Sequence, residues 1–138
     1  MRFLIDNDVF LSAIYRKHET HAPSRAWLDS VKRDGWGIAS ETYLAAVRLL
    51  MNPSVMGSGA LSAHEALDAV EAELAGSYKG RVVMASKRPD RRVLETAEGH
   101  RQVTDFWLVQ IARDSGAKLA TRDAGILARW PDDSQEVA

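Results

Sequence analysis

The sequence predicts a single α/β domain over residues 1–138, with helices on both faces of a central parallel sheet of four or five strands. This prediction rests first on alternation, because short apolar runs follow segments of helical periodicity along the whole chain. Such alternation is typical of a three-layer α/β/α arrangement. It rests secondly on length, since 138 residues suit one domain and no linker, repeat or low-complexity tract divides them.

The strands are predicted where short apolar runs stop at polar or turn residues. Four runs fit this description: Arg2–Ile5, Gly37–Ala39, Arg81–Ala85 and Lys118–Thr121. The first of them ends at Asp6 and is consistent with a buried strand.

Two helices are predicted in the first half of the chain. One covers Pro23–Lys32, with the proline in its first turn and apolar residues on one side, namely Ala26, Trp27 and Val31. The next follows Ser40, which we expect to be its N-cap, and carries an apolar stripe made of Leu44, Val47 and Met51. The breakers Pro53, Gly57 and Gly59 predict a flexible segment over Asn52–Gly59.

The clearest helix start is the capping box Ser62-Ala63-His64-Glu65, in which serine and glutamate each satisfy a backbone N–H. One face of this helix is expected to be apolar through Leu67, Val70 and Leu74.

Three more helices are predicted towards the carboxyl end. They cover Arg91–Glu98, closed by Gly99, then Thr104–Ser115, and finally Ala124–Arg129. The helix over Thr104–Ser115 is apolar on most sides, so we expect it to be buried, with Thr104 as its cap and Gly116 at its end.

The composition excludes several kinds of site. The chain has no cysteine, so it forms no disulfide, thiolate nucleophile or zinc–cysteine centre. Its four histidines are scattered and form no H-E-x-x-H motif. Any bound metal is therefore expected to be a hard ion held by oxygen ligands.

The net charge of −1 does not indicate a nucleic-acid-binding protein, yet residues 79–101 carry seven basic and three acidic side chains, a net charge of +4. This segment is either a functional basic surface or simply a solvated one. The apolar run at the amino terminus is short and ends at Asp6, and no stretch is long enough to cross a bilayer, so we expect a cytoplasmic protein without a membrane anchor.

Three aspartates fall where an open parallel sheet brings side chains together. Asp6 ends the first strand, Asp123 follows the fourth, and Asp105 lies near the start of the buried helix. Ligands of such sheets bind at the carboxyl ends of the strands. Each residue also has a structural alternative: Asp6 as a turn residue, Asp123 as an N-cap, and Asp105 as a partner of the helix dipole.

Together the three carboxylates predict a site for Mg²⁺, or alternatively Mn²⁺, because clustered carboxylates repel one another and need a cation. Phosphodiester hydrolysis is the reaction that most needs this arrangement. One or two ions would activate a water molecule and stabilise the leaving oxygen.

Short motifs around these aspartates are similar to those of one known family. Val103-Thr104-Asp105-Phe106-Trp107-Leu108 looks like a Val-Thr-Asp-x-x-Leu helix start, and Thr121-Arg122-Asp123 looks like the Thr-x-Asp that follows the next strand. Leu4-Ile5-Asp6-Asn7-Asp8 resembles a Leu-Asp-x-Asn motif. Lesser matches are Val47-Arg48-Leu49, Asn52-Pro53 and His21 ahead of Trp27-Leu28-Asp29. In these motifs, over nearly its whole length, the chain resembles the PIN-domain family and its VapC-type toxins.

This resemblance implies a Mg²⁺-dependent endoribonuclease that acts as the toxin of a type II toxin–antitoxin pair. A cognate VapB-like antitoxin would neutralise it by laying a helix into an apolar groove, and the protein would be a homodimer. Carried over by position, Asp6, Asp105 and Asp123 would be metal-binding acids, and Thr121 would support the end of the fourth strand. Basic side chains would hold the RNA backbone, the candidates being Arg48, Arg91, Arg92 and Arg101.

Two positions depart from the family pattern. Asp8 stands where the family has Asn or Ser, which keeps an acceptor oxygen and adds a charge. Ala45 stands where a Glu is common, three residues before Arg48, and it has no ligand atom. We hypothesise that Glu41, one helical turn earlier on the same face, substitutes for that Glu. The alternative is that Glu41 is a first-turn acid beside Ser40.

Two other functions stay open on sequence alone. The alanine at position 45 favours a degenerate PIN domain that binds RNA or protein without cleaving it. The Asp-x-Asp core at Asp6-Asn7-Asp8 and the later pair Asp132-Asp133 are also similar to haloacid-dehalogenase-type phosphatases. Against this second alternative, Phe10 stands where that family has Thr or Val, and the chain is short for that fold.

Overall fold

The computed structural model describes all of residues 1–138 and contains one five-stranded parallel sheet, in the order β3-β2-β1-β4-β5. Every pairing in it is parallel. The strands are β1 (Phe3–Ile5), β2 (Trp36–Ala39), β3 (Arg81–Val83), β4 (Lys118–Thr121) and β5 (Ser134–Glu136). The predicted parallel α/β architecture is confirmed, and β5 adds a strand beyond the four located from the sequence.

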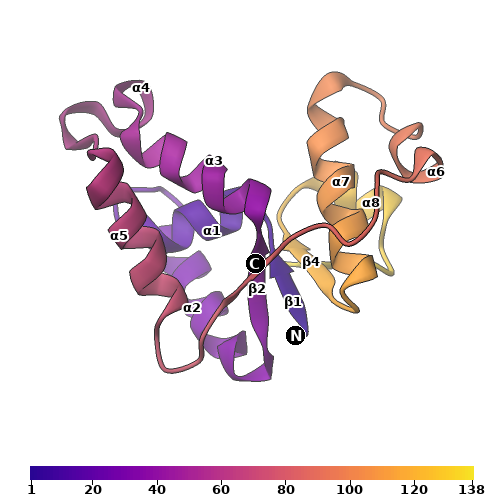
Figure 1. Cartoon of the computed structure of the whole chain (residues 1–138), viewed down its shortest axis with the longest axis horizontal. Coiled ribbons are helices and arrows are strands. Elements are labelled where there is room, and N and C mark those ends of the chain that lie inside the picture. Colours follow the sequence, from indigo (N-terminus) through magenta and orange to yellow (C-terminus); the bar gives the residue numbers. More distant parts are fainter.

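Helices cover both faces of this sheet, in three layers (Figure 1). The helices α1 to α5 lie on one side and α6 to α8 on the other. Their bounds are α1 (Asn7–Ile14), α2 (His21–Val31), α3 (Ser40–Met51), α4 (Pro53–Met56), α5 (Ala63–Leu74), α6 (Arg91–Leu94), α7 (His100–Asp114) and α8 (Ala124–Arg129), with short 3₁₀ turns η1 (Lys32–Asp34) and η2 (Gly57–Gly59). None of these helices has the length and apolar character needed to span a bilayer.

The chain order of the strands creates a crevice beside β1. From β1 the chain adds β2 and β3 on one side, and later β4 and β5 on the other. In an open parallel sheet, the point where the order reverses leaves a crevice at the carboxyl ends of the two strands concerned. Here these strands are β1 and β4, which pair from Phe3 opposite Lys118 to Ile5 opposite Ala120. Asp6 and the residues after Thr121 are thereby brought next to each other.

Each face of the sheet has its own hydrophobic core, because successive side chains of a strand point to opposite faces. In β1, Phe3 and Ile5 join the core under α1, α2, α3 and α5, whereas Leu4 joins the core under α7 and α8. The second core contains most of the buried side of α7, including Phe106 and Ile111. This confirms the expectation that the helix ending near Gly116 is buried, and it holds Asp105 on a well-packed element.

Several local predictions about helix ends are wrong. No helix was predicted directly after Asp6, yet α1 begins there, and the side chain of Asp6 caps it by accepting the backbone N–H of Asn7 at 2.8 Å. The helix α7 begins at His100 rather than Thr104, since Gly99 takes the extended N-cap conformation. Ser40 is the first residue of α3, and Ala39 occupies the N-cap position.

The predicted buried faces of three helices are also partly wrong. In α3, Leu44 is 57% exposed, and the buried residues are Thr42, Ala46 and Leu50. In α5, Leu67 is exposed while Ala66 takes its place in the core, and Ala26 of α2 is exposed as well. The reason is close packing: α3 lies against α5, and alanines let two helices approach where larger apolar side chains would not fit.

Of the remaining local predictions, some are confirmed and two are not. The capping box at Ser62 and Glu65 is present in full, and β4 and α8 have the predicted bounds. The segment Asn52–Gly59, predicted to be flexible, forms α4 followed by η2. The predicted helix over Arg91–Glu98 is shorter and ends at Leu94.

Gly80 provides a test of the packing between α5 and β3. A Cβ atom at this position would lie 2.6 Å from Cζ2 of Trp36 and 2.8 Å from Cδ2 of Leu74. The ring of Trp36 is buried, and its Nε1 donates to the carbonyl of Tyr78 at 2.8 Å, so it has little freedom to move. We therefore expect Gly80→Ala to lower the free energy of unfolding by about 1–3 kcal/mol in urea titrations.

The matched control for this substitution is Gly59→Ala. Nothing lies within 4 Å of a Cβ atom at Gly59, so the change in unfolding free energy should stay within about 0.5 kcal/mol. Equal stability of the two variants would contradict this account of the packing.

Candidate active site

Six polar residues line one cleft of about 320 Å³ at the carboxyl edge of the sheet: Asp6, Asn7, Asp8, Asp105, Arg122 and Asp123. They come from three places that are far apart in sequence, namely the junction of β1 and α1, the second turn of α7, and the junction of β4 and α8. The three aspartates singled out from the sequence therefore share one cleft.

Asp6 is the most enclosed carboxylate of the cleft, only 7% exposed. One of its oxygens, Oδ1, accepts the backbone N–H of Asn7 at 2.8 Å. The other, Oδ2, accepts the hydroxyl of Thr121 at 2.7 Å. The same hydroxyl oxygen accepts the backbone N–H of Asp123 at 3.0 Å. Thr121 thus links the end of β1 to the start of the segment that leads into α8.

Asp105 and Asp123 face this carboxylate from two helices. Asp105 lies within α7, so the alternative that it only complements the dipole of a helix start is wrong. Asp123 does cap α8, because its Oδ1 accepts the backbone N–H of Ile126 at 2.9 Å. The cap engages one carboxylate oxygen, and the residue still lines the cleft.

The crowding of negative charge raises two pKa values. Burial raises the pKa of Asp6; hydrogen bonds from Thr121 and Asn7 oppose this, and the charges of Asp123 and Asp8 add to it. Burial, and then the charges of Asp6 and Asp123, raise the pKa of Asp105 to about 6. The cleft therefore holds carboxylates whose ionised forms are disfavoured until a cation joins them.

The residues present fit a hard divalent cation. The cleft offers four carboxylates and no nitrogen or sulfur ligand that would favour a softer metal. No three acidic or histidine side chains come close enough together to form a ready-made metal site. Mg²⁺ is typically bound through one or two carboxylates with water and phosphate oxygens completing its shell, and an open cleft of this kind suits it.

Asp8 lies beside Asp6 in the first turn of α1. Its carboxylate is 3.5 Å from Nε2 of His18, and it is exposed. The backbone N–H of Thr20 donates to the other ring nitrogen of this histidine, Nδ1, at 3.2 Å. Because Nδ1 accepts, a neutral His18 carries its proton on Nε2, towards Asp8.

Glu41 does not line the cleft. It lies in the first turn of α3, and the ring N–H of Trp107 in α7 donates to its Oε2. The Ser40 hydroxyl donates to its Oε1 at 2.7 Å. Burial alone would raise the pKa of Glu41, but the hydrogen bonds from Ser40 and Trp107 lower it below its ordinary value. Both carboxylate oxygens of Glu41 therefore accept hydrogen bonds.

The four predicted RNA-binding arginines, Arg48, Arg91, Arg92 and Arg101, are all exposed and none lines the cleft. The arginine that does line it is Arg122, which the sequence analysis did not assign to the site. The signal that could have identified Arg122 is its position between Thr121 and Asp123, inside the Thr-x-Asp motif. Asn7, between the first two aspartates, was likewise not assigned.

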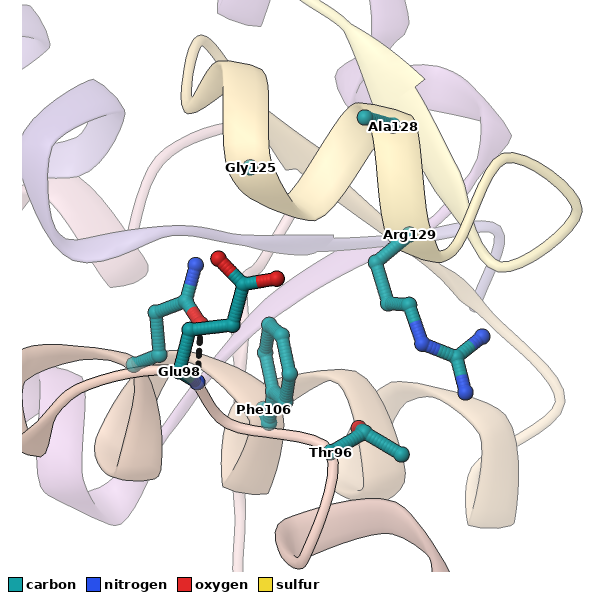
Figure 2. A pocket seen from close by; sticks show the side chains of 7 residues that line it. Thr96, Glu98, Phe106, Gly125, Ala128 and Arg129 are labelled. Atoms are coloured by element: carbon teal, nitrogen blue, oxygen red, sulfur yellow. Dashed lines mark hydrogen bonds between the residues drawn. The ribbon is translucent and has the colours of Figure 1, made fainter.

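A second cavity, of about 270 Å³, lies between the start of α7 and α8 (Figure 2). Figure 2 shows Phe106, Glu98 and Arg129 around it, with the hydrogen bond that the backbone N–H of Glu98 donates to the side chain of Gln102 at 2.8 Å. A Cβ atom at Gly125 would lie 2.9 Å from Nε2 of Gln102 and 3.1 Å from Oδ1 of Asp123. The glycine thus leaves room for Gln102 beside the cap of α8.

The repulsion inside the cleft predicts that Asp105→Asn stabilises the metal-free protein at neutral pH. The pKa of Asp105 is raised from 3.8 to about 6, so folding favours its protonated form. That contribution is present at low pH and is lost as the pH rises through about 6. In EDTA at pH 7.5, the variant should be more stable than the wild type by about 1 kcal/mol, allowing for solvent screening of this half-exposed group.

Thermal melting at pH 5 and pH 7.5 checks this prediction. The stabilisation by Asp105→Asn should shrink at pH 5, where the wild-type carboxyl is largely protonated. Asp132→Asn removes one acid that is exposed and lies outside the cleft, so it should have no such pH-dependent effect. A loss of stability in Asp105→Asn at pH 7.5 would show that the carboxylates do not repel one another.

Comparison with known proteins agrees with this geometry. The PIN domain family model matches residues 3–130. Ribonuclease VapC38 of Mycobacterium tuberculosis is 32% identical over 125 residues, which cover 89% of this chain and 86% of the relative. Ribonuclease VapC29 from the same species is 28% identical over 131 residues, covering 91% and 89%. Ribonuclease VapC39, also from this species, is 27% identical over 133 residues, covering 91% of each. The chain therefore belongs to the PIN-domain family, and within it to the VapC type.

Proposed function

We propose that this protein is a Mg²⁺-dependent endoribonuclease, the toxin of a type II toxin–antitoxin pair. The observation that carries the proposal is the cleft that gathers Asp6, Asp105 and Asp123 at the carboxyl edge of the sheet. The VapC relatives named as ribonucleases support it. Membership of the PIN-domain family favours this function over that of a phosphatase.

In this proposal Asp6 and Asp105 hold the principal divalent cation, Asp123 completes the site directly or through water, and Asp8 adds negative charge. When bound, Mg²⁺ or Mn²⁺ supplies Lewis acidity, which polarises the phosphate and lowers the pKa of the attacking water. The chain's own contribution is positioning. The hydroxyl of Thr121 and the N–H of Asn7 fix both oxygens of Asp6, and Asp105 is ionised above a pH of about 6.

Substitution of the principal acids tests the function. Asp6→Asn and Asp105→Asn each remove one negative charge at nearly constant volume, and we expect RNA cleavage to fall roughly 100-fold or more. Cleavage is measured on labelled RNA, with circular dichroism to confirm the fold. Chelation of divalent ions by EDTA should abolish wild-type cleavage, and excess Mg²⁺ should restore it. Full activity in EDTA would refute the metal-dependent mechanism.

Glu41 is the proposed fourth acid, and Glu41→Gln tests it. If its charge supports catalysis from outside the cleft, cleavage should fall roughly 10-fold or more and the Mg²⁺ concentration needed for half-maximal activity should rise. Glu71→Gln is the matched control, because Glu71 of α5 is exposed and likewise accepts a side-chain hydrogen bond, from the hydroxyl of Tyr43 at 2.6 Å. Activity and Mg²⁺ dependence close to those of the wild type would reject the catalytic role and leave Glu41 as a structural link to Trp107.

A second possible function is that of a PIN domain that binds RNA or protein but does not cleave RNA, and one specific observation favours it. Position 45 is alanine, and both oxygens of Glu41, which does not line the cleft, already accept hydrogen bonds. Retained RNA binding without cleavage at any Mg²⁺ or Mn²⁺ concentration would favour this alternative.

The proposed partners are RNA, a VapB-like antitoxin and a second copy of the chain. For RNA, the exposed Arg48, Arg91, Arg92 and Arg101 are proposed contacts for the phosphate backbone. For a protein partner, one side of the molecule exposes large apolar residues on α3, α4 and α5, namely Leu44, Met51, Val55 and Leu67. Co-expression with the product of the adjacent gene, followed by cleavage assays, tests whether that product binds and inhibits.

A further inference from the structure

We propose that Arg122 forms a phosphate-binding site inside the acidic cleft, which takes a phosphodiester group of the RNA beside the carboxylates. This inference rests on the proposed ribonuclease function and adds the residue that positions the substrate. Arg122 is the one cationic side chain among the six that line the cleft, and it leaves the end of β4 between Thr121 and Asp123.

The guanidinium of Arg122 is held by hydrogen bonds that leave its position well defined. Its Nη1 donates to the hydroxyl oxygen of Ser24 at 2.7 Å, and its Nη2 donates to the main-chain oxygen of Ala138, the last residue of the sequence, at 3.0 Å. Ser24 lies in α2 and is fully buried. A long side chain that is anchored at its tip loses less rotamer freedom when a ligand binds.

The anchor continues into the protein through a second buried serine. Ser12 of α1 donates its hydroxyl to the carbonyl of Val9 at 3.1 Å, and the hydroxyl oxygens of Ser12 and Ser24 lie 2.5 Å apart. The hydroxyl hydrogen of Ser12 is already donated to the carbonyl of Val9, and the guanidinium of Arg122 has no acceptor atom. The hydroxyl of Ser24 must therefore donate to the hydroxyl oxygen of Ser12. The chain of donors therefore runs from Arg122 through Ser24 to Ser12, and Ser24 is an acceptor for the guanidinium.

Although it lies among carboxylates, Arg122 forms no ion pair within 4.0 Å with any Asp or Glu side chain. Its two hydrogen bonds use one N–H of each terminal nitrogen. The remaining N–H groups have no acceptor within the chain. This contrasts with Arg25, whose guanidinium pairs with both Glu73 and Asp29. Arg122 is thus a cation that is not paired with any of the aspartates that line the cleft.

A ribonuclease with this cleft needs such a cation. The acids that would hold a metal ion repel the RNA backbone, and the predicted arginines lie outside the cleft. A guanidinium offers planar, paired N–H donors that match phosphate oxygens. Placed next to Asp123, Arg122 would hold a phosphate within reach of the carboxylate cluster. A merely structural Arg122 would instead tie α2 to the end of β4 and would not affect RNA.

RNA binding, measured separately from cleavage, distinguishes these roles. Each substitution is made in the Asp105→Asn protein, so that RNA is bound but not cut, and a fluorescein-labelled single-stranded RNA of mixed sequence is titrated by anisotropy across a range of salt concentrations. For Arg122→Gln we expect affinity to fall roughly 5- to 100-fold. The slope of log K against log salt should shrink by about 0.7, the value for one lost phosphate contact on a single strand.

Two further variants separate charge from structure. Arg122→Lys keeps the charge but not the planar donors, so it should keep the salt slope while binding more weakly than arginine. Arg33→Ala removes one exposed positive charge just before β2 begins, at the opposite edge of the sheet, and should change neither affinity nor slope. Melting temperatures of all variants report any loss of folding, and Arg122→Lys provides the comparison if Arg122→Gln is unstable.

The outcomes distinguish this inference from the proposed function. If Arg122→Gln lowers the melting temperature but binds RNA like Arg33→Ala, with the same salt slope, Arg122 is structural and the inference is wrong, while the ribonuclease proposal stands. If the slope of log K against log salt also shrinks by about 0.7 in Arg122→Lys, which keeps the positive charge, the charge of Arg122 does not cause the salt dependence. The inference is then wrong as well. If the protein with Arg122 intact binds no RNA and the wild type cleaves none, the proposed function itself fails.

Discussion

The hydroxyl of Thr121 is the contact on which the geometry of the cleft depends. It donates to Asp6 and accepts from the backbone N–H of Asp123, so one buried atom joins the ends of two adjacent parallel strands. Because a hydroxyl both donates and accepts, threonine or serine can make this link, whereas a valine of the same shape cannot. The link holds Asp6 against the repulsion of its neighbours, and the fully buried position of Thr121 protects it from competing water.

The cleft concentrates like charge in a partly desolvated place, which is unfavourable for folding and useful for binding. The raised pKa values of Asp6 and Asp105 both trace first to burial and then to neighbouring carboxylates. The same groups that weaken the metal-free fold would favour a divalent cation, since the cation relieves their repulsion. Arg122 brings positive charge to this cleft without pairing with any of its aspartates, and this leaves it suited to an anionic substrate.

Contacts across the carboxyl edge of the sheet connect its two helical layers. Trp107 in α7 donates to Glu41 in α3, and Arg122 after β4 donates to Ser24 in α2. These contacts flank the cleft from helices that belong to different hydrophobic cores. The position of Asp105 relative to Asp6 therefore depends on packing on both faces of the sheet.

The sequence by itself determined the fold class, most of the strands and the three aspartates, because these depend on local patterns. Apolar runs, the capping box at Ser62 and the acids that follow β1 and β4 can all be recognised within a few residues. It also located the buried helix around Phe106, whose apolar character is continuous along the chain.

Only the tertiary structure decided which side chains share the cleft and which do not. Arg122 and Asn7 line it, whereas Glu41 lies outside it, bound to Trp107. It likewise decided that Ala46 and Ala66 are buried in place of Leu44 and Leu67. The physical reason is the same in each case: the direction of a side chain depends on packing between elements distant in sequence, which no short window of residues contains.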